Sequence, residues 1–286
     1  MQVLTLETAT PHEAGSLTLA APEALRAGLR AALAPERQER LPVIAETARS
    51  RVMRLRVDGA PPLVLKRYRE PGAFLLRTFL RPSRAQREAE ALAMIGAQLG
   101  NPVQPVAWAE ERSLGFVPRS WLVTTELTDA HDLRHLERLA PDDRSRARAI
   151  AMVLLPERVA ALHRAGVFAR NLHAKNVLVQ PATGRVAFID LPRASACLLT
   201  RSRRVHDLAC LVKGLRRGLS DDDLRALLAA YARAAGVGDD LWPDVVARVE
   251  VLANRTPLAG AVDGLRRRVK GLWRGAAAAG GPWPAA

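Results

Sequence analysis

The sequence predicts an α+β protein with two lobes, a small antiparallel-sheet N-lobe followed by a larger helical C-lobe. Strand-like alternation of apolar and polar residues comes first, at residues 41–68, and a short apolar strand is expected at residues 121–127. Helical spacing then dominates from about residue 143 to residue 253. Strands first and helices later is the order typical of α+β folds. The chain has 286 residues, of which 49% are hydrophobic, and it is long enough to bury both cores.

We expect four segments along the chain. Residues 1–40 form an alanine-rich N-terminal extension, residues 41–127 form the N-lobe with a sheet and one helix, and residues 128–274 form the helical C-lobe. Residues 275–286, which read GAAAAGGPWPAA, form a flexible tail.

One strand and one helix of the N-lobe bring opposite charges together. Leu63–Tyr68 is the strand that returns from a turn at residues 58–62. Residues 84–99 have helical spacing, and Glu88 lies on an otherwise apolar face of that helix. An inward-facing glutamate needs a cation, and Lys66, at the end of an apolar strand run, is a suitable partner. The alternative for Lys66 alone is an ordinary solvent-facing strand lysine.

Four helices are expected in the C-lobe, at about residues 143–166, 203–217, 220–235 and 241–253. Pro156 falls within the first helix and predicts a break near Leu155, because proline lacks an N–H and clashes with the preceding turn. Asp207 lies in the apolar start of the second helix. We expect it to accept hydrogen bonds from backbone amides of the loop that carries Asn171, which is a structural role.

The charge of the chain points to anionic partners. Its 43 Lys and Arg residues against 29 Asp and Glu residues give a net charge of +14. Such a surface attracts nucleic acid, anionic lipid head groups or phosphorylated glycans. Zinc-finger spacing and RNA-binding aromatic motifs are lacking, and only 4% of residues are aromatic, so nucleic acid is not an expected partner. Coding bias towards arginine and a solvated surface explain part of the excess.

The sequence favours a cytoplasmic location. No run of about 18 uncharged apolar residues occurs, which argues against a transmembrane helix. The N-terminus lacks a basic start followed by an apolar stretch, so we expect no secretory signal. Cys197 and Cys210 are expected to be reduced, and a metal site built on cysteine is not supported.

Residues 163–190 contain the pattern of a phosphotransferase catalytic loop. A polar loop at residues 170–176 is followed by a hairpin of two apolar runs that ends in Asp190. Protein kinases have H-R-D-x-x-x-x-N, a short hairpin and then a metal-binding aspartate. Because a hairpin places its two ends side by side, Asn176 and Asp190 are candidate ligands of one Mg²⁺ ion. The alternative is that both residues are turn or capping residues.

Asn171 occupies the position where this pattern has its carboxylate base. An amide cannot accept a proton from a hydroxyl near neutral pH, and general-base help is worth roughly 10²–10⁴-fold. Phosphoryl transfer depends mainly on positioning and charge neutralisation, so loss of the base slows it without necessarily abolishing it. Asn171 can still orient a substrate hydroxyl. His173 is a candidate for taking the proton or touching the phosphate, and the alternative is a loop histidine bonded to backbone.

These motifs together resemble a known family. The chain resembles the bacterial lipopolysaccharide core kinases, the Kdo and heptose kinase group of the protein-kinase-like superfamily. The matching pieces are VLKRY at 64–68, LRPSRAQREAEAL at 80–92, LHRAGVFARNLHAKNVLV at 162–179, FIDLPRA at 188–194 and RRVHDLACL at 203–211. The resemblance implies a protein-kinase-like two-lobed fold. It also implies ATP-dependent phosphorylation of an inner-core sugar at the cytoplasmic face of the inner membrane.

The resemblance further implies roles for individual residues. Lys66 and Glu88 would position ATP, and Asn176 and Asp190 would bind Mg²⁺. The strand-to-linker crossing at Glu126 and Leu127 would meet the adenine ring.

Three positions depart from the family pattern. Asn171 replaces the catalytic aspartate, with Ala169 two residues before it where the pattern has histidine. The nucleotide loop has no glycine, so phosphate contact would rely on Arg49 and Ser50. Leu191 and Pro192 follow the metal-binding aspartate in place of the usual Phe-Asp.

Two basic segments are candidates for contact with an anionic membrane or with phosphorylated lipid A. Residues 74–87 combine apolar side chains with arginines, and residues 265–273 do the same near the C-terminus. The alternative for both is packing on the protein itself.

Three hypotheses follow. The first is a lipopolysaccharide-core-kinase-like phosphotransferase whose acceptor is a core or lipid A-linked sugar. The second is a pseudokinase that binds nucleotide or partner proteins and regulates envelope-sugar assembly. The third, a basic nucleic-acid-binding protein, has only charge in its favour.

Overall fold

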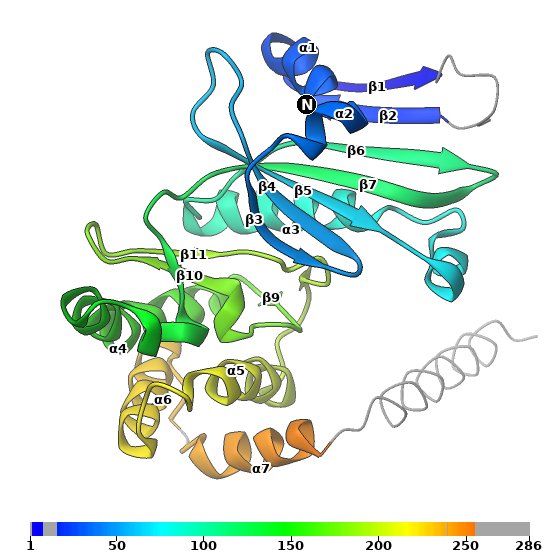
Figure 1. Ribbon diagram of the computed structural model, residues 1–286. Helices are drawn as coiled ribbons and strands as arrows, with labels where there is room; N and C mark the ends of the chain where they lie inside the picture. The colour runs from blue at the N-terminus through cyan, green and yellow to red at the C-terminus, as the bar shows by residue number, and fades with distance from the viewer. Residues whose placement is uncertain (1, 8–15, 239, 255–286) are drawn as a thin grey trace, which may run out of the picture.

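The chain forms an upper sheet lobe and a lower helical lobe, joined by the segment that follows β7 (Figure 1). The computed structural model describes residues 2–7, 16–238 and 240–254. The α+β fold with a small antiparallel-sheet N-lobe and a larger helical C-lobe, predicted from the sequence, is confirmed.

The N-lobe is built on one antiparallel sheet of seven strands in the order β1-β2-β6-β7-β5-β4-β3. The strands are β1 (Gln2–Glu7), β2 (Ser16–Ala21), β3 (Val43–Thr47), β4 (Ser50–Leu55), β5 (Leu63–Arg69), β6 (Pro105–Ser113) and β7 (Phe116–Thr125). The segment 1–40, expected as an extension, thus contributes two strands to the sheet edge, because β2 pairs with β6.

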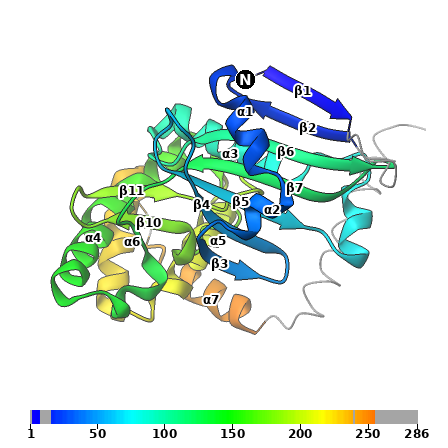
Figure 2. The same ribbon diagram turned by 45° about the horizontal axis from the view of Figure 1, so that its top comes forward.

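The two faces of this sheet are covered by different helices. Alternate residues of β5 point to opposite faces, so Leu63 and Leu65 enter one core while Tyr68 enters the other. The helices α1 (Glu23–Ala32) and α2 (Pro35–Glu39) lie over the first face, and α3 (Arg84–Leu99) lies over the second (Figure 2). Lys66, one residue from Leu65, therefore projects on the α3 side, which faces the C-lobe.

The helix α3 begins and ends at clear sequence signals. Ser83 caps its N-terminus by accepting a hydrogen bond from the Gln86 N–H at 3.0 Å. Gly100 ends it in the left-handed conformation, with φ 61°, which glycine adopts without steric cost. The predicted span of residues 84–99 is confirmed.

The C-lobe surrounds a single large core. Its long helices are α4 (Pro141–Arg164), α5 (Arg201–Leu215), α6 (Asp221–Ala235) and α7 (Trp242–Ala253). Its short elements are β8 (His131–Asp132), η2 (Leu133–Arg138), β9 (Val167–Phe168), η3 (Ala174–Asn176), β10 (Val177–Gln180), β11 (Arg185–Phe188) and β12 (Ser195–Ala196). The predicted hairpin is the β10–β11 pair, in which Val177 lies opposite Phe188.

The break predicted near Leu155 is wrong, because α4 continues through Pro156. Pro156, Leu155 and Val159 are all buried, so the helix is held by packing on both sides of the proline. This packing offsets the hydrogen bond that the proline cannot make.

Hydrogen bonds between side chains and backbone groups also join the two lobes. The Asn101 side chain, just after α3, donates to the Phe188 carbonyl at 3.1 Å and accepts from the Phe188 N–H at 2.9 Å. Arg158 of α4 donates to the carbonyl of Leu99, the last residue of α3, at 2.7 Å. The C-terminal end of α3 is therefore fixed to the C-lobe.

The described helices include none with the length and apolar character needed to cross a membrane. The predicted tail at 275–286 and the basic segment at 265–273 lie outside the described residues.

Candidate functional site

One ammonium group and two carboxylates from both lobes meet under the sheet. Lys66 Nζ, on β5, lies 2.8 Å from Asp190 Oδ1 and 3.2 Å from Glu88 Oε1. Glu88 comes from α3 and is almost fully buried, whereas Asp190 follows β11 in the C-lobe. The pairing of Lys66 with Glu88 expected from residue spacing is present, and Asp190 joins it.

Tyr68 and Arg84 complete the charge network. The Tyr68 hydroxyl donates to Glu88, and burial together with the charge of Glu88 raises the Tyr68 pKa well above its ordinary value. Arg84 Nη2 lies 3.1 Å from Asp190 Oδ1, and its guanidinium stacks over the Tyr68 ring at 4.6 Å. Glu88 is thereby held in place as a buried anion with a cation and a hydroxyl around it.

Asp190 has both a strained backbone and a perturbed carboxylate. Its φ is 51°, in the left-handed region that residues other than glycine rarely adopt. Burial opposes ionisation, but the positive charges of Lys66 and Arg84 outweigh it and lower the pKa of Asp190. The residue is therefore a carboxylate at neutral pH, which is the form a metal ion requires.

Asn176 is oriented by the chain around it. Its amide nitrogen donates to the Asn171 carbonyl at 2.9 Å and to the Asp190 carbonyl at 3.3 Å. Its amide oxygen accepts no hydrogen bond from the described residues and remains a candidate ligand. Amide and carboxylate oxygens are the donors that Mg²⁺ takes.

The part of the chain that the structure describes supplies too few ligands to hold a metal alone. The described residues contain no group of three or more His, Cys, Asp or Glu side chains arranged for a metal. Mg²⁺ in phosphotransfer sites is bound by one or two protein ligands together with substrate phosphates. Asn176 and Asp190 fit that arrangement.

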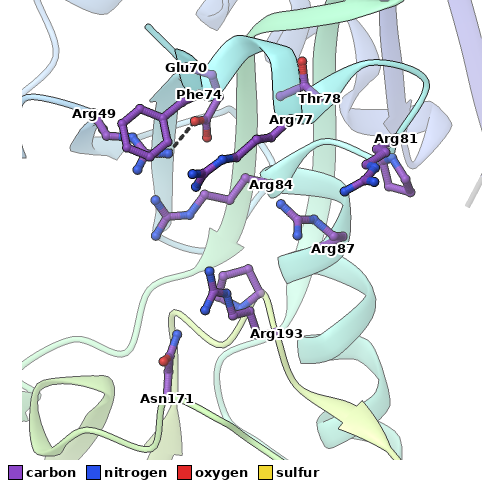
Figure 3. A pocket seen from close by; sticks show the side chains of 12 residues that line it. Arg49, Glu70, Phe74, Arg77, Thr78, Arg81, Arg84, Arg87, Asn171 and Arg193 are labelled. Atoms are coloured by element: carbon purple, nitrogen blue, oxygen red, sulfur yellow. Dashed lines mark hydrogen bonds and ion pairs between the residues drawn. The ribbon is translucent and has the colours of Figure 1, made fainter. Parts of the chain in front are cut away.

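Asn171 lies at the C-lobe side of a cavity of about 520 Å³ (Figure 3). Glu70, which pairs with Arg49, is the only carboxylate among the described residues that line this cavity. No second carboxylate there replaces the missing base.

His173 lies apart from that cavity. Its imidazole is near helix α5, where a backbone hydrogen bond involving Cys210 favours its charged form. Burial and then the positive charge of Lys175 prevail and lower the His173 pKa. The imidazole is therefore neutral at pH 7, but the structure does not bring it together with Asn171's cavity-facing side chain.

Asp207 anchors the loop that carries Asn171. Its Oδ2 accepts the Ala169 N–H at 2.8 Å, as expected, and lies 3.5 Å from His163 Nε2. His163 in turn contacts the Tyr231 hydroxyl at 2.7 Å through Nδ1. This buried network, from α4, α5 and α6, fixes the loop from beneath.

The predicted phosphate-loop residues separate into two roles. Arg49, in the β3–β4 turn, pairs with Glu70 and lines the cavity. The Ser50 hydroxyl instead lies 2.9 Å from the Thr47 hydroxyl and closes the turn itself.

The predicted adenine contacts lie at the end of β7. The Glu126 N–H donates to the Pro62 carbonyl at 2.8 Å, and its carboxylate pairs with Arg54 at 2.8 Å. The backbone of Leu127 makes no hydrogen bond with the described residues. The N–H and carbonyl groups of Leu127 are therefore the backbone groups in this crossing that are available to a ligand.

Sequence reasoning missed Arg84 as a site residue. It lies four residues before Glu88, so both occupy one face of α3, and this spacing was the available signal. Arg77, Arg81 and Arg87 belong to the basic segment 74–87, which the sequence indicated for a membrane or lipid A rather than for this cavity. Arg193, about 100 residues later, could not be grouped with them from the sequence.

A two-lobed fold in which a lysine, a buried glutamate and an Asn–Asp pair meet at one site defines a kinase-like phosphotransferase. The model of the lipopolysaccharide kinase (Kdo/WaaP) family matches residues 74–231, more than half of the chain. The protein belongs to this family of kinases, as the sequence indicated. The matched stretch contains Glu88, Asn171, Asn176 and Asp190 but begins after Lys66, whose assignment rests on the geometry above.

The fold is also similar to that of a solved structure, WaaP in complex with acyl carrier protein. The TM-score is 0.51 at 23% sequence identity, over 89% of this chain and 99% of that chain. Among curated protein sequences, none matches this chain.

Proposed function

We propose that the protein transfers a phosphoryl group from ATP to a hydroxyl of an inner-core sugar, Kdo or heptose, of lipopolysaccharide. The observation that carries the proposal is the meeting of Lys66, Glu88 and Asp190, from both lobes, at distances of 2.8–3.2 Å. Asn176 hydrogen-bonds to the Asp190 carbonyl beside them. A lysine held by a glutamate, next to an amide and a carboxylate, is suited to binding a nucleoside triphosphate with its metal ion.

Each residue would have a separate task. Bound Mg²⁺ and ATP would supply the phosphoryl group and part of the charge neutralisation. Lys66, held by Glu88, would bind phosphate oxygens, while Asn176 and Asp190 would hold the metal. The backbone of Leu127 would accept the adenine ring, and Asn171 would orient the acceptor hydroxyl. Without a carboxylate base, the proton would leave late and the rate would depend on positioning and charge.

A nucleotide-binding pseudokinase in envelope-glycolipid assembly is the second candidate. Asn171 favours it, because Glu70, the one carboxylate among the described residues that line the cavity beside Asn171, is already paired with Arg49. Under this alternative the Lys66 and Asp190 site still binds nucleotide, and only transfer is lost.

We also place the protein at the inner face of the inner membrane, as a peripheral protein. The segment after β5 exposes Leu76 by 69%, Phe79 by 47% and Leu80 by 74%. Leu114, at the neighbouring β6–β7 turn, is exposed by 86%. Arg77 and Arg81 alternate with these apolar residues along the sequence, and a segment that combines apolar and basic residues favours an anionic lipid surface.

The nucleotide site is tested with Asp190→Ala and a control, Asp58→Ala, in an exposed N-lobe turn. ATP with Mg²⁺ should raise the melting temperature of the wild type and of the control, and should have no effect on Asp190→Ala. Transfer of labelled phosphate to core glycolipid then separates the kinase from the pseudokinase. Unchanged Mg²⁺-dependent binding by Asp190→Ala would contradict the metal assignment.

A further inference from the structure

The cavity in front of Asn171 is strongly basic. Among the described residues that line it, six are arginines, contributed by both lobes (Figure 3). They are Arg49, Arg77, Arg81, Arg84, Arg87 and Arg193. Two have carboxylate partners, since Arg49 pairs with Glu70 and Arg84 with Asp190.

The other four arginines make no ion pair with a carboxylate in the part of the chain that the structure describes. Partial burial and then the charge of Arg193 lower the pKa of Arg87; Arg84 and Arg81 add to this, and Glu70 opposes it. Like charges this close destabilise one another unless an anion lies between them.

The guanidinium groups at the top of the cavity are held in place by an aromatic ring. Arg49 stacks on Phe74 at 3.9 Å, and Arg77 lies 5.1 Å from the same ring. The Nε of Arg49 is buried and has no hydrogen-bond partner. Fixed guanidinium planes with unused N–H groups are suited to bidentate contacts with phosphate or carboxylate.

The basic surface continues beyond this cavity. A second cavity of about 530 Å³ shares Arg87, Pro192 and Arg193 with the first and adds Arg170 together with one carboxylate, Glu90. The two cavities adjoin at these shared residues, between α3 and the segment after Asp190, and we call them together the arginine groove. Lys66 and Asp190 themselves do not line either cavity, so the groove lies beside the nucleotide site.

We propose that this arginine groove is an anion subsite for the acceptor, which already carries a phosphate or carboxylate close to the hydroxyl that is phosphorylated. The inference rests on the proposed function, since it assigns the acceptor to the Asn171 side of the site. The groove selects glycans with anionic groups over neutral glycans, and it aligns the hydroxyl by gripping its charged neighbour.

The test measures binding rather than turnover, so it does not depend on Asn171. The full chain is titrated with a fluorescently labelled, deacylated core oligosaccharide that retains its phosphates, and with the same oligosaccharide after removal of phosphate by hydrofluoric acid. The variant is Arg87→Ala with Arg193→Ala. The control, Arg56→Ala with Arg185→Ala, removes the same charge from exposed positions outside the groove.

We expect the groove variant to bind the phosphorylated oligosaccharide about a hundredfold more weakly, because it loses the charge-assisted hydrogen bonds of two arginines. The control should bind within about twofold of the wild type. If only the phosphorylated form loses affinity, the groove recognises phosphate; if the dephosphorylated form also does, it recognises carboxylate. Wild-type affinity of the groove variant for both forms would overturn the proposal.

Nucleotide binding separates this inference from the proposed function. The groove variant should keep the increase in melting temperature that ATP with Mg²⁺ gives the wild type. Loss of that increase with oligosaccharide binding unchanged would assign the arginines to the nucleotide and overturn the subsite. The wild type could also bind the oligosaccharide through these arginines and bind no nucleotide. That result would refute the proposed function but would still support a groove that binds anionic glycans.

Discussion

At the scale of single residues, the side chain of Asn171 is not what holds its loop in place. The loop is held by backbone groups, since the Asn171 carbonyl accepts from the His173 N–H at 2.7 Å and from the Asn176 side chain at 2.9 Å. Asp207 fixes Ala169 from below. The Asn171 side chain can therefore change without altering the positions of Asn176 and Asp190.

Asn171→Asp should increase phosphoryl transfer to a core acceptor by roughly 10²-fold, because it restores a carboxylate that can accept the hydroxyl proton. The measurement is kcat with ATP and Mg²⁺, compared with Asn171→Ala, which removes the orienting amide and should be slower than the wild type. A decrease in kcat for Asn171→Asp would show that the amide itself has a role in the reaction.

Whether a residue of the site could be predicted from the sequence depends on how far along the chain its partners lie. Asn171, Asn176 and Asp190 were predictable because one loop and one hairpin fix their spacing. Glu88 was predictable from helical periodicity. The arginine groove was not, because it needs the segment after β5, the helix α3 and Arg193 of the other lobe to be brought together, and no local pattern encodes that meeting.

At the scale of elements, η1 (Gly72–Thr78) and the residues after it form an apolar and basic projection. Phe79 contacts Phe116 with ring centroids 4.9 Å apart, and the Leu80 N–H donates to the Gly115 carbonyl at 3.0 Å. The segment is thus fastened to the β6–β7 turn and presents Leu76 and Leu80 outwards. Such an anchored, exposed patch suits a lipid surface.

Leu76→Asp with Leu80→Asp should weaken binding to phosphatidylglycerol vesicles by at least about tenfold, because each leucine loses its apolar insertion and gains repulsion from anionic lipid. Cosedimentation measures the bound fraction. Leu198→Asp, at an equally exposed leucine of the C-lobe, serves as control and should bind like the wild type. Equal binding by all three proteins would remove the membrane assignment.

The elements themselves were predicted unevenly. The span of α3 was predicted from the helical spacing of residues 84–99, and the structure shows Ser83 and Gly100 as cap residues at its two ends. The strand pair β1–β2 was not foreseen, because β2 finds its partner β6 about 90 residues later and long-range pairing leaves little local pattern. At Pro156 the local pattern predicted a break that the structure does not have, because the packing of buried side chains overrides the preference of proline to end a helix.

At the scale of the whole molecule, Asp190 is the point where charge joins the lobes. Lys66 and Arg84 come from the N-lobe, at 2.8 Å and 3.1 Å from the same carboxylate oxygen of the C-lobe. Because these cations lower the pKa of Asp190, its ionised form stabilises the folded state. That contribution is fully present above the ordinary aspartate value of 3.8 and is lost as the pH falls through the lowered pKa.

Asp190→Asn should therefore lower the free energy of unfolding at pH 7, by about 1–2 kcal/mol, and the difference from the wild type should shrink below about pH 4. Urea unfolding at several pH values measures it, with Asp58→Asn as the control for loss of a carboxylate charge. A difference that stays constant down to pH 3 would show that Asp190 contributes through packing rather than through charge.

The reciprocal hydrogen bonds between Asn101 and Phe188 determine which end of α3 can move relative to the C-lobe. They fasten one end of α3 to the C-lobe, two residues before Asp190, so this end behaves as a pivot. The helix is about 24 Å long, so any swing of the upper lobe moves its opposite end the most. Arg84 and Arg87 lie near that far end of the helix. A ligand that binds there and also contacts Arg193 would therefore be best placed to bring the two lobes closer together.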